Sequence, residues 1–146
     1  MNASQKKAKA YTNIEIETGV ATGDPHKLIL MLFEGALIAL SDARKCLEAK
    51  NIPAKGMAIS KAIRIIDEGL KASLDEKSGG EIAGHLTELY DYMCRRLLIA
   101  SLRNEAEPIY EVAKLLIQLK QAWETIGQKP ANTISDQNVS AANIRG

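Results

Sequence analysis

The chain has 146 residues, of which 46% are hydrophobic and only 4% aromatic, and its formal net charge is +1 at pH 7. This length fits one domain that can bury its own core, and an apolar content made mostly of Leu, Ile and Ala favours helices over sheet. A near-neutral charge without a basic stripe argues against nucleic-acid binding, and the longest apolar run, 28–33, is too short to span a membrane. Two cysteines without CxxC spacing are typical of free thiols in a reducing compartment, so we expect a cytoplasmic protein.

Residues 1–20 are expected to form a flexible arm or a short cap. The first ten residues are small, polar and basic, and Tyr11, Ile14 and Val20 belong to a sparse apolar series after them. The series lacks the continuous apolar stretch of a secretory signal. An arm this short cannot fold alone, but it can cover an apolar surface from which it is easily displaced.

The first helix is expected over 24–47, because Asp24 is a good N-cap and Pro25 fits the first helical position. At about 100° per residue, one face is apolar along its whole length and is centred on Ile29, Phe33, Leu40 and Leu47. Leu30, Met31 and Ile38 fall on the other side, together with polar residues. The helix therefore carries more apolar residues than one core face requires.

A second helix is predicted from the Asn51-Ile52-Pro53 connection to about Ser73. Its inner face is formed by Ile59, Ala62, Ile63, Ile66, Leu70 and Ser73. Ile65 is predicted to point away from that face. The following segment 74–80, LDEKSGG, is the strongest breaker in the chain, so we expect a chain reversal there.

The third helix, predicted over 81–103, places Ile82, Leu86, Leu89, Met93, Leu97 and Ala100 in one stripe. Leu98, Ile99 and Leu102 project away from it. A fourth helix is predicted to start in the run 105–108 and to end at Gly127. It carries a seam with spacings of three and four, formed by Ile109, Val112, Leu116, Leu119, Trp123 and Ile126. Tyr110 and Ile117 lie outside this seam.

Helices of this length joined by short connections predict an all-α, antiparallel up-down-up-down four-helix bundle over 21–127. Residues 128–146 are rich in Asn, Ser and Ala, and their few aliphatic residues are too scattered for a packed helix. We therefore expect a flexible C-terminal tail.

No catalytic, cofactor or metal site is expected. A di-metal bundle site needs two Glu-x-x-His pairs, whereas the chain has two histidines, of which His26 is interpreted as a surface or capping residue and His85 follows Glu81 by four positions. Cys46 and Cys94 have no histidine at a neighbouring helical position, so they are interpreted as core thiols. A metal- or haem-binding bundle is kept as the alternative function, and an enzyme is not expected.

The surplus apolar residues allow two interpretations. In the first, the bundle is simply wide, or the arm and tail cover these side chains. Alternatively, they form a surface that binds amphipathic helices of a partner through anchors spaced by three, four and seven residues. The candidate partner-binding residues are Tyr11, Ile14, Val20, Leu30, Met31, Ile38, Ile65, Leu98, Ile99, Leu102, Tyr110 and Ile117.

Several blocks of the sequence resemble one known family. They are Tyr11, VATGDPHKL at 20–28, MLFEGA at 31–36, KAIRII at 61–66, SLD at 73–75, GGEIA at 79–83, LYDYM at 89–93 and AW at 122–123. In this order they are similar to the FliS family of flagellin-specific export chaperones, over about 11–126. Gly23 stands where the family commonly has Ala, and His85 where it usually has Asn.

The resemblance implies a mostly antiparallel bundle that binds the C-terminal segment of flagellin in the cytoplasm and keeps it from polymerising early. It also implies delivery to the flagellar type III export apparatus through the membrane protein FlhA, with the region around Tyr11 involved in that step. A homodimer through the same apolar surface, and a role for the tail, are left open.

Overall fold

The structure, a computed structural model, describes residues 23–128, and within this range it is entirely helical apart from short connections. Four helices follow one another: α2 (Pro25–Glu48), α3 (Ile52–Arg64), α4 (Glu76–Arg103) and α5 (Glu107–Gln128). A π-helical segment, η1 (Ile65–Lys71), continues α3 without a break. The expected all-α fold is therefore confirmed, whereas the arm 1–20 and nearly all of the tail lie outside the described residues.

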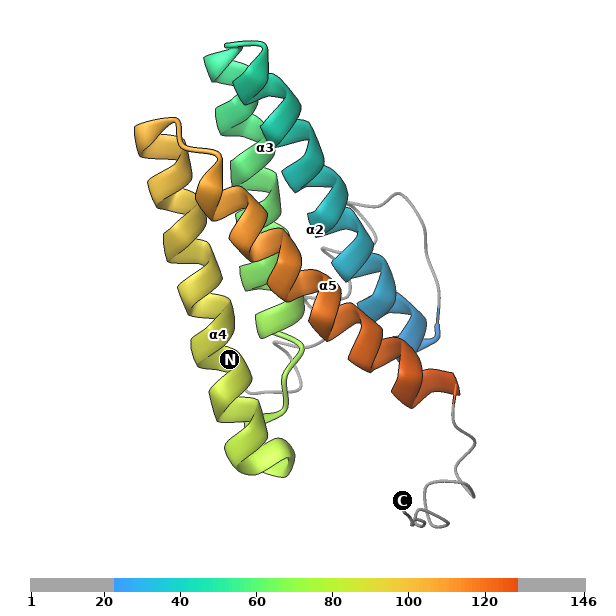
Figure 1. Cartoon of the computed structure of the whole chain (residues 1–146). Coiled ribbons are helices and arrows are strands. Elements are labelled where there is room, and N and C mark those ends of the chain that lie inside the picture. The colour runs from blue at the N-terminus through green and yellow to red at the C-terminus, as the bar shows by residue number, and fades with distance from the viewer. Residues whose placement is uncertain (1–22, 129–146) are drawn as a thin grey trace.

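The four helices form an antiparallel bundle (Figure 1). Along the bundle, α2 packs against α3 and α5, and α4 packs against η1, α3 and α5. Each helix thus has two neighbours and one face directed at a shared core. This arrangement is the predicted up-down-up-down topology.

The N-terminus of α2 is capped as the sequence predicts. Asp24 has an extended backbone, and its Oδ1 accepts hydrogen bonds from the backbone N–H groups of His26 (3.0 Å) and Lys27 (3.4 Å). Pro25 occupies the first turn, where its missing N–H leaves no intrahelical bond unmade. This cap fixes the position of the first turn of α2, which the functional site uses below.

The core is built mostly from small and branched aliphatic residues, with the buried aromatic rings of Phe33 and Tyr90. Its fully buried members include Leu32, Leu40, Ile59, Ile66, Leu70, Met93, Leu97, Ile109, Val112 and Leu116. Ala36, Ala43, Ala62 and Ala100 are also completely buried, which lets the helices approach closely. No exposed apolar residue is needed to complete this core.

Two residues assigned to the core from helical periodicity are in fact exposed: Ile82 (72% exposed) and Ile126 (55%). Ile82 lies in the first turns of α4 and Ile126 in the last turn of α5. At this end of the bundle α4 and α5 diverge (Figure 1), so the two helices no longer cover each other there.

The chain reverses slightly earlier than the predicted position in the LDEKSGG segment, 74–80. The chain reverses at about 72–75, and one turn of helix has already formed from Glu76, with Gly79 N–H bonded to the carbonyl of Asp75 (2.7 Å). Gly80 then departs from helical geometry (φ 59°, ψ −133°), a conformation open mainly to glycine. Regular helix after this kink therefore begins close to the predicted start at Glu81.

At the opposite end of the bundle, a buried lysine joins two helix ends. Lys55 is only 3% exposed, and its Nζ donates a hydrogen bond to the carbonyl oxygen of Ser101 (2.7 Å) in the last turn of α4. Helix C-termini carry partial negative charge and unpaired carbonyls, so an ammonium group is well placed there. Lys55 thereby ties the start of α3 to the end of α4.

Candidate functional site

Most of the predicted surplus residues are accessible on the bundle surface. Five are exposed: Ile38 (63%), Leu98 (52%), Leu102 (75%), Tyr110 (54%) and Ile117 (44%). Three more are half-buried: Leu30, Met31 and Ile99. We call these eight residues the apolar belt. Tyr11, Ile14 and Val20 lie outside the described residues.

The prediction that Ile65 points away from the core is wrong. Ile65 is 3% exposed, and its side chain packs toward α2, where a Cβ added at Gly35 would lie 3.5 Å from its Cδ1. Up to Ile65 the chain winds as an α-helix, since the backbone N–H of Ile65 bonds to the carbonyl oxygen of Lys61. The side chain is buried because α2 packs along α3 and η1 on this side as well. Ile66, Gly69 and Leu70 of η1 are also buried.

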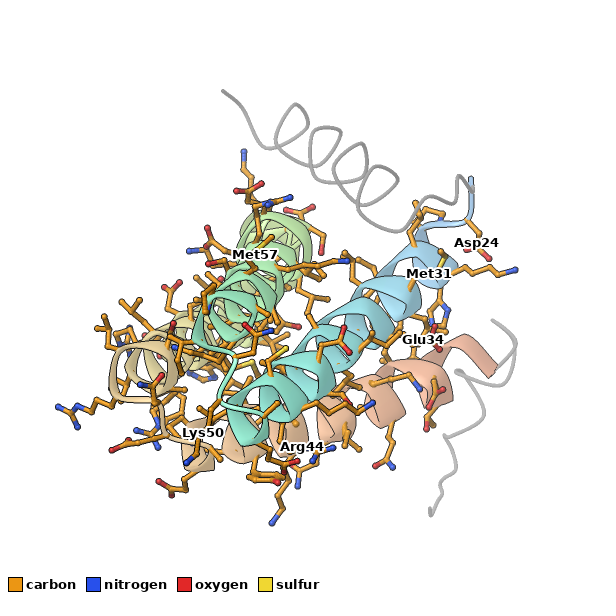
Figure 2. The ribbon with its side chains drawn as sticks, turned by 90° about the horizontal axis from the view of Figure 1, so that it is seen from above. Asp24, Met31, Glu34, Arg44, Lys50 and Met57 are labelled. Carbon is orange, nitrogen blue, oxygen red and sulfur yellow. The ribbon has the colours of Figure 1, made fainter. Side chains whose placement is uncertain are left out.

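The belt is distributed over three helices, α2, α4 and α5, and does not form a single pocket. Met57 on α3 (76% exposed) adds a further apolar side chain that the sequence analysis did not select. Figure 2 views the bundle from above and shows Met31 on α2 and Met57 on the neighbouring α3. Apolar side chains are therefore presented on all four helices, around the bundle.

Charged groups that accompany the belt on α4 and α5 are paired with one another. Glu111 accepts a hydrogen bond from the hydroxyl of Tyr92 (2.5 Å) and another from Nε of Arg96 (2.6 Å). These two bonds hold the pKa of the Glu111 carboxyl below its ordinary value. Arg96 also lies 3.5 Å from Glu107. The cluster joins the two helices.

A second ionic cluster fixes η1 on α4. Nζ of Lys71 lies 2.7 Å from Asp91 and 3.1 Å from Asp67. Hydrogen bonds to Asp91 and then Asp67 raise the pKa of the Lys71 ammonium group. On the other side of the bundle, Lys120 bridges α5 to Glu34 of α2 at 4.0 Å, and in Figure 2 Glu34 lies on the side of α2 that faces α5.

A separate apolar groove lies at the end of the bundle where α4 and α5 diverge. It encloses about 670 Å³ and is lined mainly by apolar and aromatic side chains, among them Ile29, Phe33, Leu70, Leu86, Tyr90 and Trp123. Ile82 is exposed at its edge, which explains its position away from the core. None of the belt residues lines this groove.

One wall of the groove is closed by a reciprocal pair. The indole N–H of Trp123 donates to the carbonyl oxygen of His26 (3.0 Å), and Nε2 of His26 lies 2.8 Å from the carbonyl oxygen of Trp123. Because a carbonyl can only accept, Nε2 must carry the hydrogen. The two rings also stack, with centroids 4.8 Å apart and an interplanar angle of 11°. The sequence analysis interpreted His26 as a surface or capping residue. The structure shows instead that its ring is part-buried against Trp123.

The sequence blocks already contained both members of this pair, in GDPHKL and AW, but nothing in them indicated that they meet. The two residues are 97 positions apart. Gly127 packs against the same ring, since a Cβ there would lie 2.0 Å from His26 Cε1. The last turn of α5 therefore lies directly on the first turn of α2.

The Cys94 thiol is part-buried. Burial raises the pKa of the Cys94 thiol to about 11, so it stays protonated at neutral pH. Between residues 23 and 128 no three His, Cys, Asp or Glu side chains gather closely enough to hold a metal ion. None of the helices in this range is long and apolar enough to cross a membrane.

The chain matches a family model described as "Flagellar protein FliS" over residues 7–130. It is 55% identical to the flagellar secretion chaperone FliS of Salmonella typhimurium over 121 residues, which cover 83% of this chain and 90% of the relative. It is 42% identical to the flagellar secretion chaperone FliSB of Pseudomonas aeruginosa, over 84% of this chain and 97% of the relative. The Escherichia coli FliS is also 42% identical, over 82% and 88% of the two chains. The chain therefore belongs to the FliS family.

Proposed function

We propose that this protein is a cytoplasmic flagellar secretion chaperone that binds the C-terminal helical segment of flagellin. In this role it prevents premature filament polymerisation and delivers flagellin to the flagellar type III export apparatus. The names of the three relatives support the role in secretion. The choice of flagellin as the substrate follows from the sequence resemblance described above.

The observation that carries the proposal is the apolar belt. The core is complete without it, yet Ile38, Leu98 and Leu102 each expose more than half of their surface. Exposed apolar residues that are spread over several helices are a hazard for a protein with no partner, and they suit a partner that supplies apolar helix faces.

The distribution of the belt favours a segment that wraps around the bundle over a compact partner. A disordered segment that folds as it binds can bury about 1,000–3,000 Å², at a cost of about 2–5 kcal/mol for its ordering. Such a segment can place successive helices against α2, α4 and α5 in turn. One pocket would not need accessible apolar residues on so many faces.

The N-terminal arm is proposed to shield part of the belt in the free protein. Tyr11, Ile14 and Val20 would be released when flagellin binds, and the region around Tyr11 would then engage FlhA at the export gate. Hydrogen exchange of residues 11–20 with and without a flagellin C-terminal fragment tests this step. Equal protection in both states contradicts it.

The alternative, a metal- or haem-binding bundle, has no observation in its favour. The ring of His26 stacks on Trp123 and its Nε2 bonds to the carbonyl oxygen of Trp123, and His85 is exposed on α4. Elemental analysis and a visible absorption spectrum of the purified protein would detect either group. A homodimer through the belt would compete with flagellin, and light scattering at several concentrations would reveal it.

The decisive experiment measures flagellin binding by variants of the belt. Leu98→Ser together with Leu102→Ser should weaken binding of a flagellin C-terminal fragment by tenfold or more, because each central apolar anchor typically contributes more than about 1 kcal/mol. Helicity and Tm should stay close to those of the wild type, since both side chains are exposed.

Ile126→Ser is the matched control, because Ile126 is equally apolar and 55% exposed but lies outside the proposed binding set. Its binding should equal that of the wild type. Unchanged affinity of the Leu98/Leu102 variant would refute the belt as the flagellin site, and a loss of helicity would show that these residues support the fold.

A further inference from the structure

The outer face of α3 carries an open hollow that the apolar belt does not explain. The hollow encloses about 620 Å³ and lies along α3, with one lining residue from the last turn of α4. Its lining residues, none of which belongs to the belt, are Pro53, Gly56, Met57, Ser60, Lys61, Arg64 and Ser101. From Pro53 to Arg64 the hollow follows about three turns of helix, or roughly 16 Å, so its length suits an extended ligand such as a helix.

The charges on this face are all of one sign. Helix α3 contains Lys55, Lys61 and Arg64 and no acidic residue, although the whole chain has a net charge of only +1. Lys61 and Arg64 are exposed and line the hollow, and none of its lining residues is acidic. The buried ammonium group of Lys55 adds positive charge next to the hollow, since it bonds to the carbonyl oxygen of Ser101. A concave surface with this charge attracts negatively charged groups.

Two further residues of α3 favour a partner that also makes apolar contacts. Met57, labelled in Figure 2, is 76% exposed, and methionine adapts its shape readily at binding surfaces. Gly56 lies inside α3, where glycine is less favourable than alanine, yet a Cβ added there would meet no other atom within 4 Å. The packing of the bundle therefore does not require glycine at this position, and the missing side chain leaves room in the hollow.

We propose that this face of α3 binds an amphipathic helix of a second protein partner, one that carries acidic residues beside its apolar anchors. The anchors contact Met57, the carboxylates pair with Lys61 and Arg64, and the small residues Gly56 and Ser60 let the helix approach closely. Because these ion pairs are near the surface, binding weakens as the salt concentration rises. The belt residues do not line this face, so the partner binds independently of them.

Fluorescence anisotropy with the full-length protein tests this proposal. The probe is a labelled peptide of about 18 residues, with Leu at spacings of three and four and Glu at most other positions. Lys61→Glu together with Arg64→Glu should weaken its binding by about tenfold or more, because attraction is replaced by repulsion. Lys27→Glu together with Lys77→Glu is the matched control, since both lysines are exposed outside the hollow and the net charge changes equally; its affinity should equal that of the wild type. A peptide with Lys in place of Glu should bind the wild type about tenfold more weakly or worse.

A second variant, Gly56→Leu, tests the hollow without changing any charge. The new side chain fills part of the hollow and should weaken peptide binding by about fivefold or more, whereas Tm should not fall, because leucine favours a helix more than glycine does. Gly84→Leu on α4, where an added Cβ also meets no atom within 4 Å, should leave the affinity unchanged. Wild-type affinity in both α3 variants refutes the proposal. A loss of peptide binding in the Leu98→Ser/Leu102→Ser variant that neither α3 variant shows also refutes it, because the peptide would then occupy the belt.

Discussion

A single methyl group added at Gly69 should destabilise this protein, although the same change usually stabilises a helix. Gly69 lies in η1 and faces α2 at close range. A Cβ at this position would lie 2.7 Å from Leu32 Cδ2, 3.1 Å from Cδ1 and 3.5 Å from Cγ. Carbon atoms in proteins normally approach to about 3.5–4.0 Å, so one of the two side chains must move by about 1 Å.

The balance can be worked out from two opposing terms. Replacing Gly by Ala in a helix interior gains about 0.5–1 kcal/mol from backbone entropy. Leu32 is 1% exposed and surrounded by the core, so it cannot rotate freely away, and overpacking of this kind costs about 1–3 kcal/mol. The net loss for Gly69→Ala is about 1 kcal/mol, which lowers Tm by about 3–5 °C for a chain of this length.

Thermal unfolding followed by circular dichroism measures the effect, and two glycines provide matched controls. Gly56 on α3 and Gly84 on α4 have no atom within 4 Å of an added Cβ. Gly56→Ala and Gly84→Ala should therefore raise Tm by the amount that helix propensity alone predicts. In a background carrying Leu32→Val, the cost of Gly69→Ala should shrink, because the crowding methyl groups are removed.

An increase of Tm for Gly69→Ala equal to that of the two controls would refute this reasoning. It would mean that α2 and η1 do not approach as closely as the distances indicate. A cost that is the same with Leu32 or Val at position 32 would place the strain elsewhere.

Three further predictions concern the ends and the surface of the bundle. Lys55→Met should cost about 1–3 kcal/mol in urea denaturation, because it leaves a part-buried carbonyl at the end of α4 without its donor; an unchanged midpoint would contradict this. His26→Ala should remove the stack and one hydrogen bond with Trp123 and speed hydrogen exchange in the last turns of α5, while amides near Lys55 at the other end stay protected. Glu111→Gln should lower Tm slightly at pH 7 and not at pH 3. Folding lowers the pKa of the Glu111 carboxyl below its ordinary value of 4.5. The charged carboxylate therefore stabilises the fold above that value, and this stabilisation is lost as the pH falls through the folded pKa. An equal loss of Tm at both pH values would show that the Gln acts through packing.

The sequence alone determined the number, order and approximate ends of the helices, because these depend on local rules. Asp24 and Pro25 mark the start of α2, the spacing from Ile109 to Trp123 gives the inner face of α5, and the surplus of Leu98 and Leu102 is visible on a helical wheel. Each of these features needs only neighbours within one or two helical turns.

The tertiary structure decided what the wheel could not. The wheel assumes one inner face with a partner along its whole length, and this assumption fails in particular places. Ile65 is buried because α2 packs against a second side of the helix, and Ile82 is exposed because α4 and α5 diverge at one end of the bundle. The groove and the contact of His26 with Trp123 depend on where chain segments 97 positions apart come to rest, which packing of the whole bundle fixes.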